Sequence, residues 1–316
     1  MISMMNKSVA LIGGGGFIGT NLSSFFNKKD YNILIIGRSV DENTSNKKIQ
    51  KRLIDVNKTS KLIEAVQEYE NVIWLVNDLV PSSSRDSLVD DFSFNVSPLI
   101  HFLESANKLK NLKRFVFISS GGTIYGDSPN RILLNEENIK NPLSAYGLSK
   151  IITENYIEFI TKRSSFESII IRPSNVYGNH QNFKKPQGIV GYAFNAIINN
   201  ETIDLYGEGK VIRDFIHVLD LAEAIKCCIE NKHQISNVET YNVSSQEGVT
   251  INEILNLINK VSQSEIQTKS KPSRVFDCEF NVLSIHKINS KLGWKPKIKI
   301  NEGLENVWNW INSEIK

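Results

Sequence analysis

Tyr146 and Lys150 are the side chains best suited to moving a proton. They stand four residues apart in the segment Tyr-Gly-Leu-Ser-Lys, so on a helix they lie on one face, one turn apart. A free tyrosine has a pKa of about 10, and a nearby ammonium favours its ionised form. Such a tyrosine can take a proton from an alcohol or give one to a ketone. Lys150 could also hydrogen-bond the ribose of a bound cofactor.

A glycine-rich turn near the N-terminus predicts a phosphate site. The apolar run 9–12 leads into Gly13, Gly16 and Gly19. Without side chains, such a loop lets a phosphate reach backbone N–H groups, and the N-terminus of a following helix adds further donors. Between the first strand and the first helix of a parallel sheet, this spacing is typical of dinucleotide binding. The residues expected to contact the cofactor here are Gly13, Gly16, Phe17, Ile18 and Gly19.

The end of the second apolar run bears on which dinucleotide binds. A site for NAD usually carries Asp or Glu there, whereas this chain has Gly37, Arg38 and Ser39. A guanidinium can pair with a 2′-phosphate, so Arg38 favours NADP(H) over NAD(H), unless it is an ordinary surface arginine. Asp55 and Val56, after the third strand, are expected to contact the adenine.

Short apolar runs alternate with helical patterns in the first half of the chain. Near-continuous apolar strands separated by helices indicate a parallel sheet buried on both faces. We therefore predict an α/β fold with a doubly wound parallel (Rossmann) sheet. Residues 1–172 form the expected dinucleotide-binding domain. Residues 173–316, where the alternation weakens, form mainly a smaller substrate lobe, with some segments returning to the first domain. The expected strands include 9–12, 33–36, 72–76, 114–118 and 168–171, and the expected helices include 20–28, 60–68, 219–230, 251–261 and 302–311.

Composition excludes several classes of protein. The formal net charge of the 316 residues is only +3, which argues against a nucleic-acid partner. No segment approaches the roughly 20 apolar residues of a membrane span, and the N-terminus lacks the pattern of a signal peptide. The three cysteines have neither metal-site nor redox spacing. We expect a cytoplasmic protein without a bound metal.

Several ordered motifs together carry a family resemblance. They are the glycine loop 13–19, Ser-Ser-Gly-Gly-Thr-Ile-Tyr-Gly at 119–126, the Tyr146–Lys150 segment, Arg-Pro-Ser-Asn-Val-Tyr-Gly at 172–178, Arg-Asp-Phe-Ile-His-Val at 213–218 and Pro-Ser-Arg-Val-Phe-Asp at 272–277. With these motifs the chain resembles the extended short-chain dehydrogenase/reductase family, in its NAD(P)-dependent nucleotide-sugar epimerase/dehydratase branch. The resemblance covers nearly the whole chain.

The resemblance implies roles for matching positions. Tyr146 would be the acid/base and Lys150 its partner. The positions expected to bind the nucleotide sugar are Ser120, Asn175, Arg213, Arg274 and Asp277. Two phosphates need cations, and arginine offers a planar fork, although a surface salt bridge is the alternative for both arginines. Residues 82–85 would line the sugar pocket or form a polar turn. The resemblance also implies a homodimer.

Two positions depart from the family pattern. Many relatives carry a Ser or Thr where this chain has Gly121, so the hydroxyl that bonds the reacting sugar oxygen must come from Thr123, Ser120 or a water. We favour Thr123. Dehydratases carry an Asp-Glu pair where this chain has Gly122 and Thr123, which argues against dehydration. His217 is expected to pack beneath the site.

Three functions fit these motifs. The favoured one is an NADP(H)-dependent reductase of a nucleotide-linked 4-keto sugar, such as a dTDP-4-keto-6-deoxyhexose, with hydride transfer at C4. The alternative is a 4-epimerase of a UDP-hexose or UDP-N-acetylhexosamine that keeps NAD tightly bound. Arg38 tilts the choice to the reductase, because reductases of this kind consume NADPH. A third, non-enzymatic redox sensor would not need Tyr146 and Lys150, which are both present.

Overall fold

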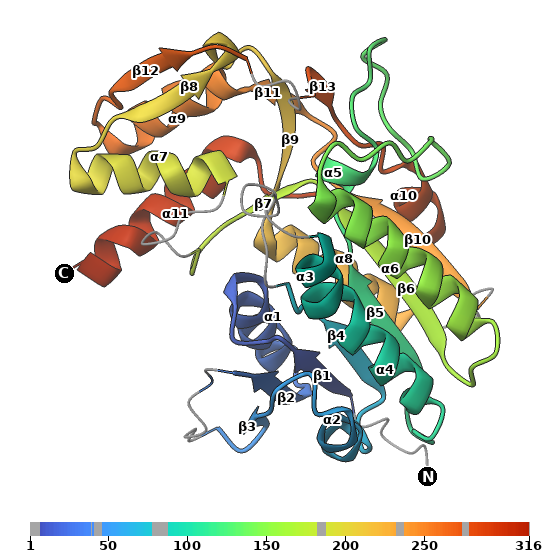
Figure 1. Cartoon of the computed structure of the whole chain (residues 1–316). Helices are drawn as coiled ribbons and strands as arrows, with labels where there is room; N and C mark the ends of the chain where they lie inside the picture. The colour runs from blue at the N-terminus through green and yellow to red at the C-terminus, as the bar shows by residue number, and fades with distance from the viewer. Residues whose placement is uncertain are drawn as a thin grey trace. The chain divides into compact units, whose positions relative to one another are not determined.

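A seven-stranded sheet organises most of the first half of the chain (Figure 1). The computed structural model describes residues 7–38, 40, 46–77, 88–181, 188–231, 237–273 and 278–315. The strand order is β10-β6-β5-β4-β1-β2-β3, and every pairing from β6 through β3 is parallel. The strands are β1 (Ser8–Ile12), β2 (Asn32–Gly37), β3 (Ile49–Leu53), β4 (Asn71–Trp74), β5 (Arg114–Ile118), β6 (Glu167–Pro173) and β10 (Val238–Val243). This order reverses between β1 and β4, which is the point where such sheets bind ligands.

Both faces of this sheet are covered, as its apolar strands predict. Alternate residues of β1 point to opposite faces, and Ala10 and Ile12 join a buried cluster with side chains of three helices. Those helices are α2 (Thr59–Val66), α4 (Ser97–Ala106) and α6 (Ala145–Thr161). Helix α1 (Phe17–Lys28) buries Leu22 and Phe26 away from that cluster. The predicted doubly wound Rossmann fold is therefore confirmed.

Two local features of this sheet were not expected. Helix α1 begins at Phe17 rather than Thr20, directly after Gly16 in an extended conformation. Between β4 and α4 the chain forms a short helix α3 (Leu88–Asp91) that continues into a π-helical turn, η1 (Phe92–Val96). π-helical turns are rare and often accompany functional sites.

A second, smaller group of strands is centred on β9 (Ile212–His217). It pairs with β11 (Gly248–Thr250) antiparallel, and with β13 (Phe280–Asn281) and β7 (Asn175–Tyr177) in parallel. A separate two-stranded parallel sheet joins β8 (Ile203–Tyr206) and β12 (Thr268–Lys271). Helices α7 (Gly188–Asn199), α9 (Ile251–Ser262) and α11 (Ile300–Ile315) share a buried apolar core with these strands. The remaining elements are α5 (Gly121–Ile124), η2 (Gly207–Gly209), α8 (Val218–Glu230) and α10 (His286–Leu292).

Helix α9 shows how local sequence sets an element boundary here. The Thr250 side chain accepts a hydrogen bond from the Glu253 backbone N–H at 3.1 Å, and the Glu253 carboxylate accepts one from the Thr250 N–H at 2.7 Å. This capping box satisfies donors that a helix start otherwise leaves unpaired. The helix then ends at Gln263 in the left-handed conformation.

The chain divides into two compact units whose segments alternate in sequence. The first unit contains residues 1–119, 145–171 and 225–240, and the second contains 120–144, 172–224 and 241–316. The functional division that we expect, with a dinucleotide domain to residue 172 and a substrate lobe after it, remains a prediction. Across the described ranges, no helix is long and apolar enough to cross a membrane.

Candidate active site

The glycine loop follows β1 in the first unit, and its packing requires glycine at two positions. Gly13 has a φ of +83°, and a Cβ there would lie 2.8 Å from the Val76 nitrogen, so only glycine fits. A Cβ on Gly19 would lie 2.4 Å from the Gly14 oxygen, because the helix start packs directly on the loop. Gly16 is exposed and directly precedes α1, whose N-terminus receives no side-chain cap.

The residues of this loop therefore fit a dinucleotide. A Cβ on Gly16, the residue before α1, would meet no atom closer than 3.8 Å, so the space beside this residue is open. Phe17 and Ile18, the first helical residues, are half-buried. A helix N-terminus next to exposed glycine backbone favours an anionic phosphate.

The residues expected at the adenosine end lie after β2 and β3, in the same unit. Arg38 directly follows β2 and is exposed. Asp55 follows β3, and its carboxylate accepts hydrogen bonds from the Asn57 N–H at 2.9 Å and the Asn57 side-chain amide at 3.0 Å. Val56 packs partly buried against the sheet core. Asp55 thus shapes its own turn, and the adenine contact stays a prediction. Ser39 lies outside the described residues.

Helix α6 brings Tyr146 and Lys150 together, as their spacing predicts. The Lys150 ammonium nitrogen lies 5.4 Å from the centre of the Tyr146 ring and 4.8 Å from that of Phe117. It donates a hydrogen bond of 3.0 Å to the Ile118 carbonyl at the carboxyl end of β5. Lys150 is only 7% exposed, and this burial lowers its pKa to about 8. An ammonium at this position favours the ionised form of a neighbouring phenol.

The second unit gathers the hydroxyl and amide groups expected to meet a sugar. Ser120 precedes α5, and the Thr123 hydroxyl donates to the Ser120 carbonyl at 3.4 Å. The Asn175 side chain lies beside the same helix, because a Cβ on Gly122 would be 3.8 Å from both its amide nitrogen and its oxygen. Asn175 also donates to the Asp214 carbonyl at 2.8 Å. The contact of Thr123 with Ser120 is long, and long contacts are weak hydrogen bonds.

Gly121, which departs from the expected family pattern, is closely packed against other side chains and backbone. A Cβ at this position would lie 2.4 Å from the Leu283 Cδ1 and 3.1 Å from the Arg172 oxygen. The buried Leu283 side chain therefore occupies the space that a serine or threonine would need. The glycine at position 121, which departs from the family pattern, is thus matched by the packing of Leu283, which follows β13 in the second unit.

The proposed diphosphate clamp is described only in part. Arg213 is half-buried, and its guanidinium donates to the carbonyls of Ile212 at 2.9 Å and Cys278 at 2.7 Å. Arg274, Asp277 and residues 82–85 lie outside the described residues. A hollow of about 560 Å³ lies among described residues of the second unit. Its lining consists of Gly207, Glu208, Lys210, Ser270, Lys271, Pro272 and Ser273.

His217 is buried within the second unit. It is 2% exposed, its Nδ1 accepts a hydrogen bond from the Leu219 N–H at 3.3 Å, and its ring meets Tyr177 edge-on with 5.3 Å between ring centres. Burial lowers the pKa of His217 to about 4, so the imidazole is neutral at physiological pH. Within the described ranges no group of three or more His, Cys, Asp or Glu side chains is arranged to hold a metal ion.

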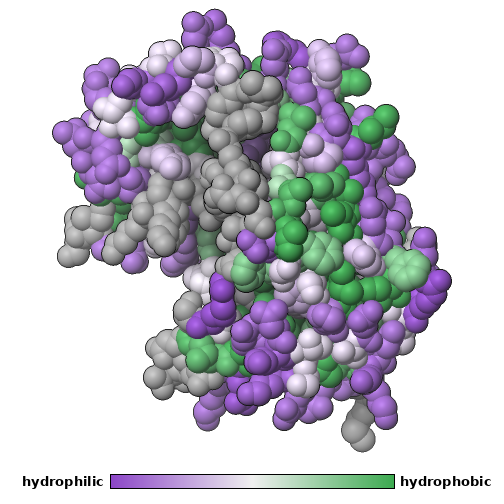
Figure 2. Space-filling model, in the orientation of Figure 1, coloured by the Kyte–Doolittle hydropathy of each residue, from purple (hydrophilic) through white to green (hydrophobic). Residues whose placement is uncertain are grey.

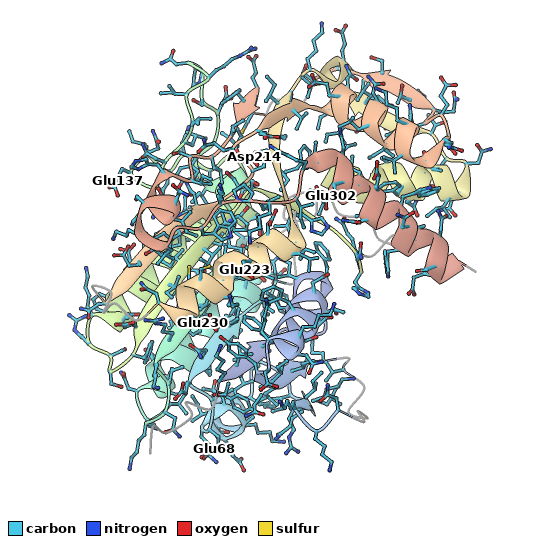
Figure 3. All side chains as sticks on the ribbon, turned by 180° about the vertical axis from the view of Figure 1, so that it is seen from behind. Glu68, Glu137, Asp214, Glu223, Glu230 and Glu302 are labelled. Atoms are coloured by element: carbon cyan, nitrogen blue, oxygen red, sulfur yellow. The ribbon has the colours of Figure 1, made fainter. Side chains whose placement is uncertain are left out.

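Asp214 is a central residue that the motif analysis left without a role (Figure 3). Its fully buried carboxylate accepts hydrogen bonds from Ser174 Oγ at 3.0 Å, from Ser245 N and Oγ at 3.0 and 2.9 Å, from the Gln246 N–H at 3.2 Å and from the Leu283 N–H at 3.3 Å. Burial raises the pKa of this carboxyl, against those bonds. Asp214 thus ties β9 to the segments that carry Asn175 and Leu283. Its signal in the sequence is its place in the motif 213–218, which assigned it no role.

Comparison with known proteins identifies the family. Residues 9–244 match the sequence profile of the NAD dependent epimerase/dehydratase family. The chain belongs to this family. The resemblance drawn from the motifs is thereby confirmed.

Individual relatives span most or nearly all of the chain. A Methanocaldococcus jannaschii protein, whose own assignment as a UDP-glucose 4-epimerase is provisional, is 30% identical over 96% of this chain and 98% of its own length. An Escherichia coli dTDP-4-dehydro-6-deoxyglucose reductase is 29% identical over 75% of this chain and 73% of its own length. A Thermus thermophilus UDP-glucose 4-epimerase, solved in complex with NAD, has a TM-score of 0.86 at 25% identity, covering 96% of this chain and 99% of that one.

These similarities bear on two expectations. They support the epimerase alternative better than the favoured reductase, because the epimerase relatives match across nearly the whole chain and the reductase across about three quarters of it. The preference for NADP(H), inferred from Arg38, receives no support, since the family is named for NAD. One exposed arginine after β2 was too weak a basis for that preference.

Replacing Asp214 with alanine should destabilise the protein. The Ser245, Gln246 and Leu283 N–H groups would lose a buried acceptor, and we expect the free energy of unfolding to fall by roughly 3 kcal/mol. Urea unfolding followed by circular dichroism measures this. Glu137→Ala, at an exposed carboxylate of the same unit, is the control and should stay within about 0.5 kcal/mol of the unmodified protein. Equal stability of the two variants would contradict the role given to Asp214.

Proposed function

We propose that this protein is a 4-epimerase of a nucleotide-linked hexose, with a UDP-hexose or UDP-N-acetylhexosamine as substrate. The observation that carries the proposal is full-length similarity to a provisional UDP-glucose 4-epimerase, combined with the Tyr146–Lys150 pair beside the end of β5. Epimerisation at C4 needs one acid–base residue and no net oxidant. In this chain Tyr146 is the candidate acid–base residue, and Lys150 is its partner.

Tyr146 is the proposed acid–base residue. Its phenolate removes the proton from the C4 hydroxyl of the sugar and later returns it to the same oxygen. A bound nicotinamide supplies the reversible hydride acceptor that oxidation and re-reduction at C4 require. Lys150 keeps a positive charge beside the phenol, which favours the phenolate that begins the reaction.

Binding roles follow from the same proposal. Gly13, Gly16, Phe17, Ile18 and Gly19 hold the dinucleotide diphosphate, with Asp55 and Val56 at the adenine and Lys150 at the ribose. On the substrate side, Thr123 and Ser120 meet the reacting hydroxyl, and Asn175, Arg213, Arg274 and Asp277 hold the nucleoside diphosphate. The dinucleotide half would be residues 1–172 and the substrate half mainly 173–316. Leu283 beside Gly121 supports Thr123 as the hydroxyl donor.

A 4-keto sugar reductase is the second candidate. Arg38 and the similarity to the E. coli reductase favour it. A reductase consumes its cofactor and an epimerase regenerates it, so the two reactions differ in the amount of cofactor consumed for each sugar converted.

Tyr146→Phe should abolish C4 epimerisation. Loss of the acid–base group is expected to lower kcat about 10²–10⁴-fold while leaving cofactor affinity unchanged. UDP-glucose and UDP-N-acetylglucosamine are incubated with the purified holoenzyme, and the C4 epimers are separated by chromatography. Tyr156→Phe, at an exposed position of the same helix, is the matched control. Oxidation of added NADPH in proportion to a 4-keto sugar, without epimerisation, would instead identify the reductase.

NAD, rather than NADP, should be the nucleotide that the protein carries. An epimerase that regenerates its cofactor in each cycle has no need of exchange, so we expect mass spectrometry of the denatured protein to detect NAD. The denatured Arg38→Ala protein should also release NAD. An empty site that binds NADPH more than about tenfold tighter than NADH, with the preference lost in Arg38→Ala, would contradict this and restore the role of Arg38 at a 2′-phosphate.

The expected homodimer has a candidate surface on α6. Leu148, Tyr156 and Phe159 lie on one side of this helix and are 42%, 40% and 59% exposed. Phe92 and Phe94, in the π-helical turn, are 37% and 48% exposed. Figure 2 shows hydrophobic surface gathered where Figure 1 draws α4 and α6. Apolar patches of this kind mark protein interfaces.

Phe159→Glu should convert such a dimer into monomers. A charge in an apolar interface would lose its hydration without gaining a partner. Sedimentation velocity measures the mass of the unmodified protein and of the variant. Ile139→Glu, at an 86% exposed position in the second unit, should leave the dimer intact. A monomeric unmodified protein would refute the dimer.

A further inference from the structure

Three ionisable side chains are buried together around α6 in the first unit. Lys150 is 7% exposed, and Asp91 and Glu154 are both fully buried. Buried charges are costly unless they have partners. The proposed reaction uses only Lys150, so the two carboxylates need a separate explanation.

Lys150 bridges two segments of backbone. It belongs to α6, and its ammonium donates a hydrogen bond of 3.0 Å to the Ile118 carbonyl at the end of β5. Both residues of this contact have a serine as a sequence neighbour: Ser149 precedes Lys150, and Ser119 follows Ile118. Both serines are buried.

Each of these serines donates to one of the carboxylates. Ser119 Oγ donates to Glu154 at 2.6 Å, and Ser149 Oγ donates to Asp91. Asp91 also accepts a bond of 2.8 Å from the Asn95 amide, across the π-helical turn. Asp91 therefore joins η1 to α6, and Glu154 joins α6 to the end of β5.

We propose that Asp91 and Glu154 are positioning residues for the Tyr146–Lys150 pair: they hold it in place through Ser149 and Ser119, and their negative charges stabilise the Lys150 ammonium. This inference rests on the proposed function in one respect: it takes Tyr146 and Lys150 to be the working pair. Neither carboxylate needs to touch the substrate or the cofactor.

The charge of the carboxylates matters as well as their hydrogen bonds. Among the described residues, the charged groups that act on Lys150 are Asp91 from α3 and Glu154 from its own helix, with the Tyr146 phenol beside it. Strand β5 presents the Phe117 ring and the Ile118 carbonyl. Burial lowers the pKa of Lys150 to about 8, and both carboxylates oppose that shift.

The sign of the expected effect follows. Replacing Asp91 with asparagine keeps an acceptor for Ser149 but removes a negative charge, so the pKa of Lys150 should fall further. Lys150 would then lose its proton at a lower pH and cease to favour the Tyr146 phenolate. The alkaline limit of kcat should move down by about one pH unit, and kcat at pH 8 should fall about fivefold relative to kcat at pH 6.

The test compares Asp91→Asn with Asp90→Asn, an identical change at the exposed neighbouring position. Lysine labelled with ¹³C at Cε is incorporated, and the NMR signals are titrated in the holoenzyme without substrate. The Lys150 signal is assigned by its loss in Lys150→Arg. We expect this signal to titrate near pH 8 in the unmodified protein and in Asp90→Asn, and at lower pH in Asp91→Asn. The pH profile of kcat is then measured for the same proteins.

The outcomes separate this inference from the proposed function. An unchanged Lys150 titration in a folded Asp91→Asn protein would overturn it, whatever reaction the enzyme catalyses. A lowered titration midpoint would support it even if the substrate proved not to be a UDP-hexose. If Asp91→Asn fails to fold, Glu154→Gln gives the same reading from the other carboxylate.

Discussion

A charge removed from water must be surrounded by partners, and the candidate site is organised by charges that meet this constraint. In the first unit, Lys150 is buried against the end of β5 with Asp91 and Glu154 close by. In the second, Asp214 is buried inside β9 and accepts hydrogen bonds from three other segments. Breaking such an arrangement costs more than its net contribution to stability. The backbone around each charge is consequently held to one conformation.

The same constraint connects the fold to the chemistry. The parallel sheet brings the glycine loop after β1 and the Lys150 contact on β5 to its carboxyl edge, where ligands of such sheets bind. Glycine at 13 and 19 lets the loop pack closely on β4 and α1. Precise proton transfer requires donor and acceptor to be held within hydrogen-bond reach. Rigid elements, rather than loops, supply most of the side chains proposed for that step.

Much of the fold could be predicted because its signals are local. Strands β1, β2, β4, β5 and β6 contain continuous apolar runs, and the Tyr146–Lys150 spacing is fixed by the period of a helix. The edge strands β3 and β10 are more polar and were not among the expected strand ranges. The π-helical turn was not predicted, because its segment carries no periodic pattern that distinguishes it from an ordinary helix. The role of Asp214 was equally hidden, because its partners come from residues 31 to 69 positions away. The preference for NADP(H) that Arg38 predicts rests on one exposed side chain and stays a prediction.

Gly121 and Leu283 constrain how this protein can change over generations. The end of the Leu283 side chain, from a distant segment, fills the space beside Gly121, so a side chain at 121 fits only if Leu283 shifts or a smaller residue first replaces it. That first step alone would leave a cavity, at a cost of roughly 2–5 kcal/mol for a leucine truncated to alanine. Neither order of substitution passes through a well-packed intermediate. The side chain that can stand at position 121 is therefore tied to the packing of residue 283, although the two positions lie far apart in the sequence.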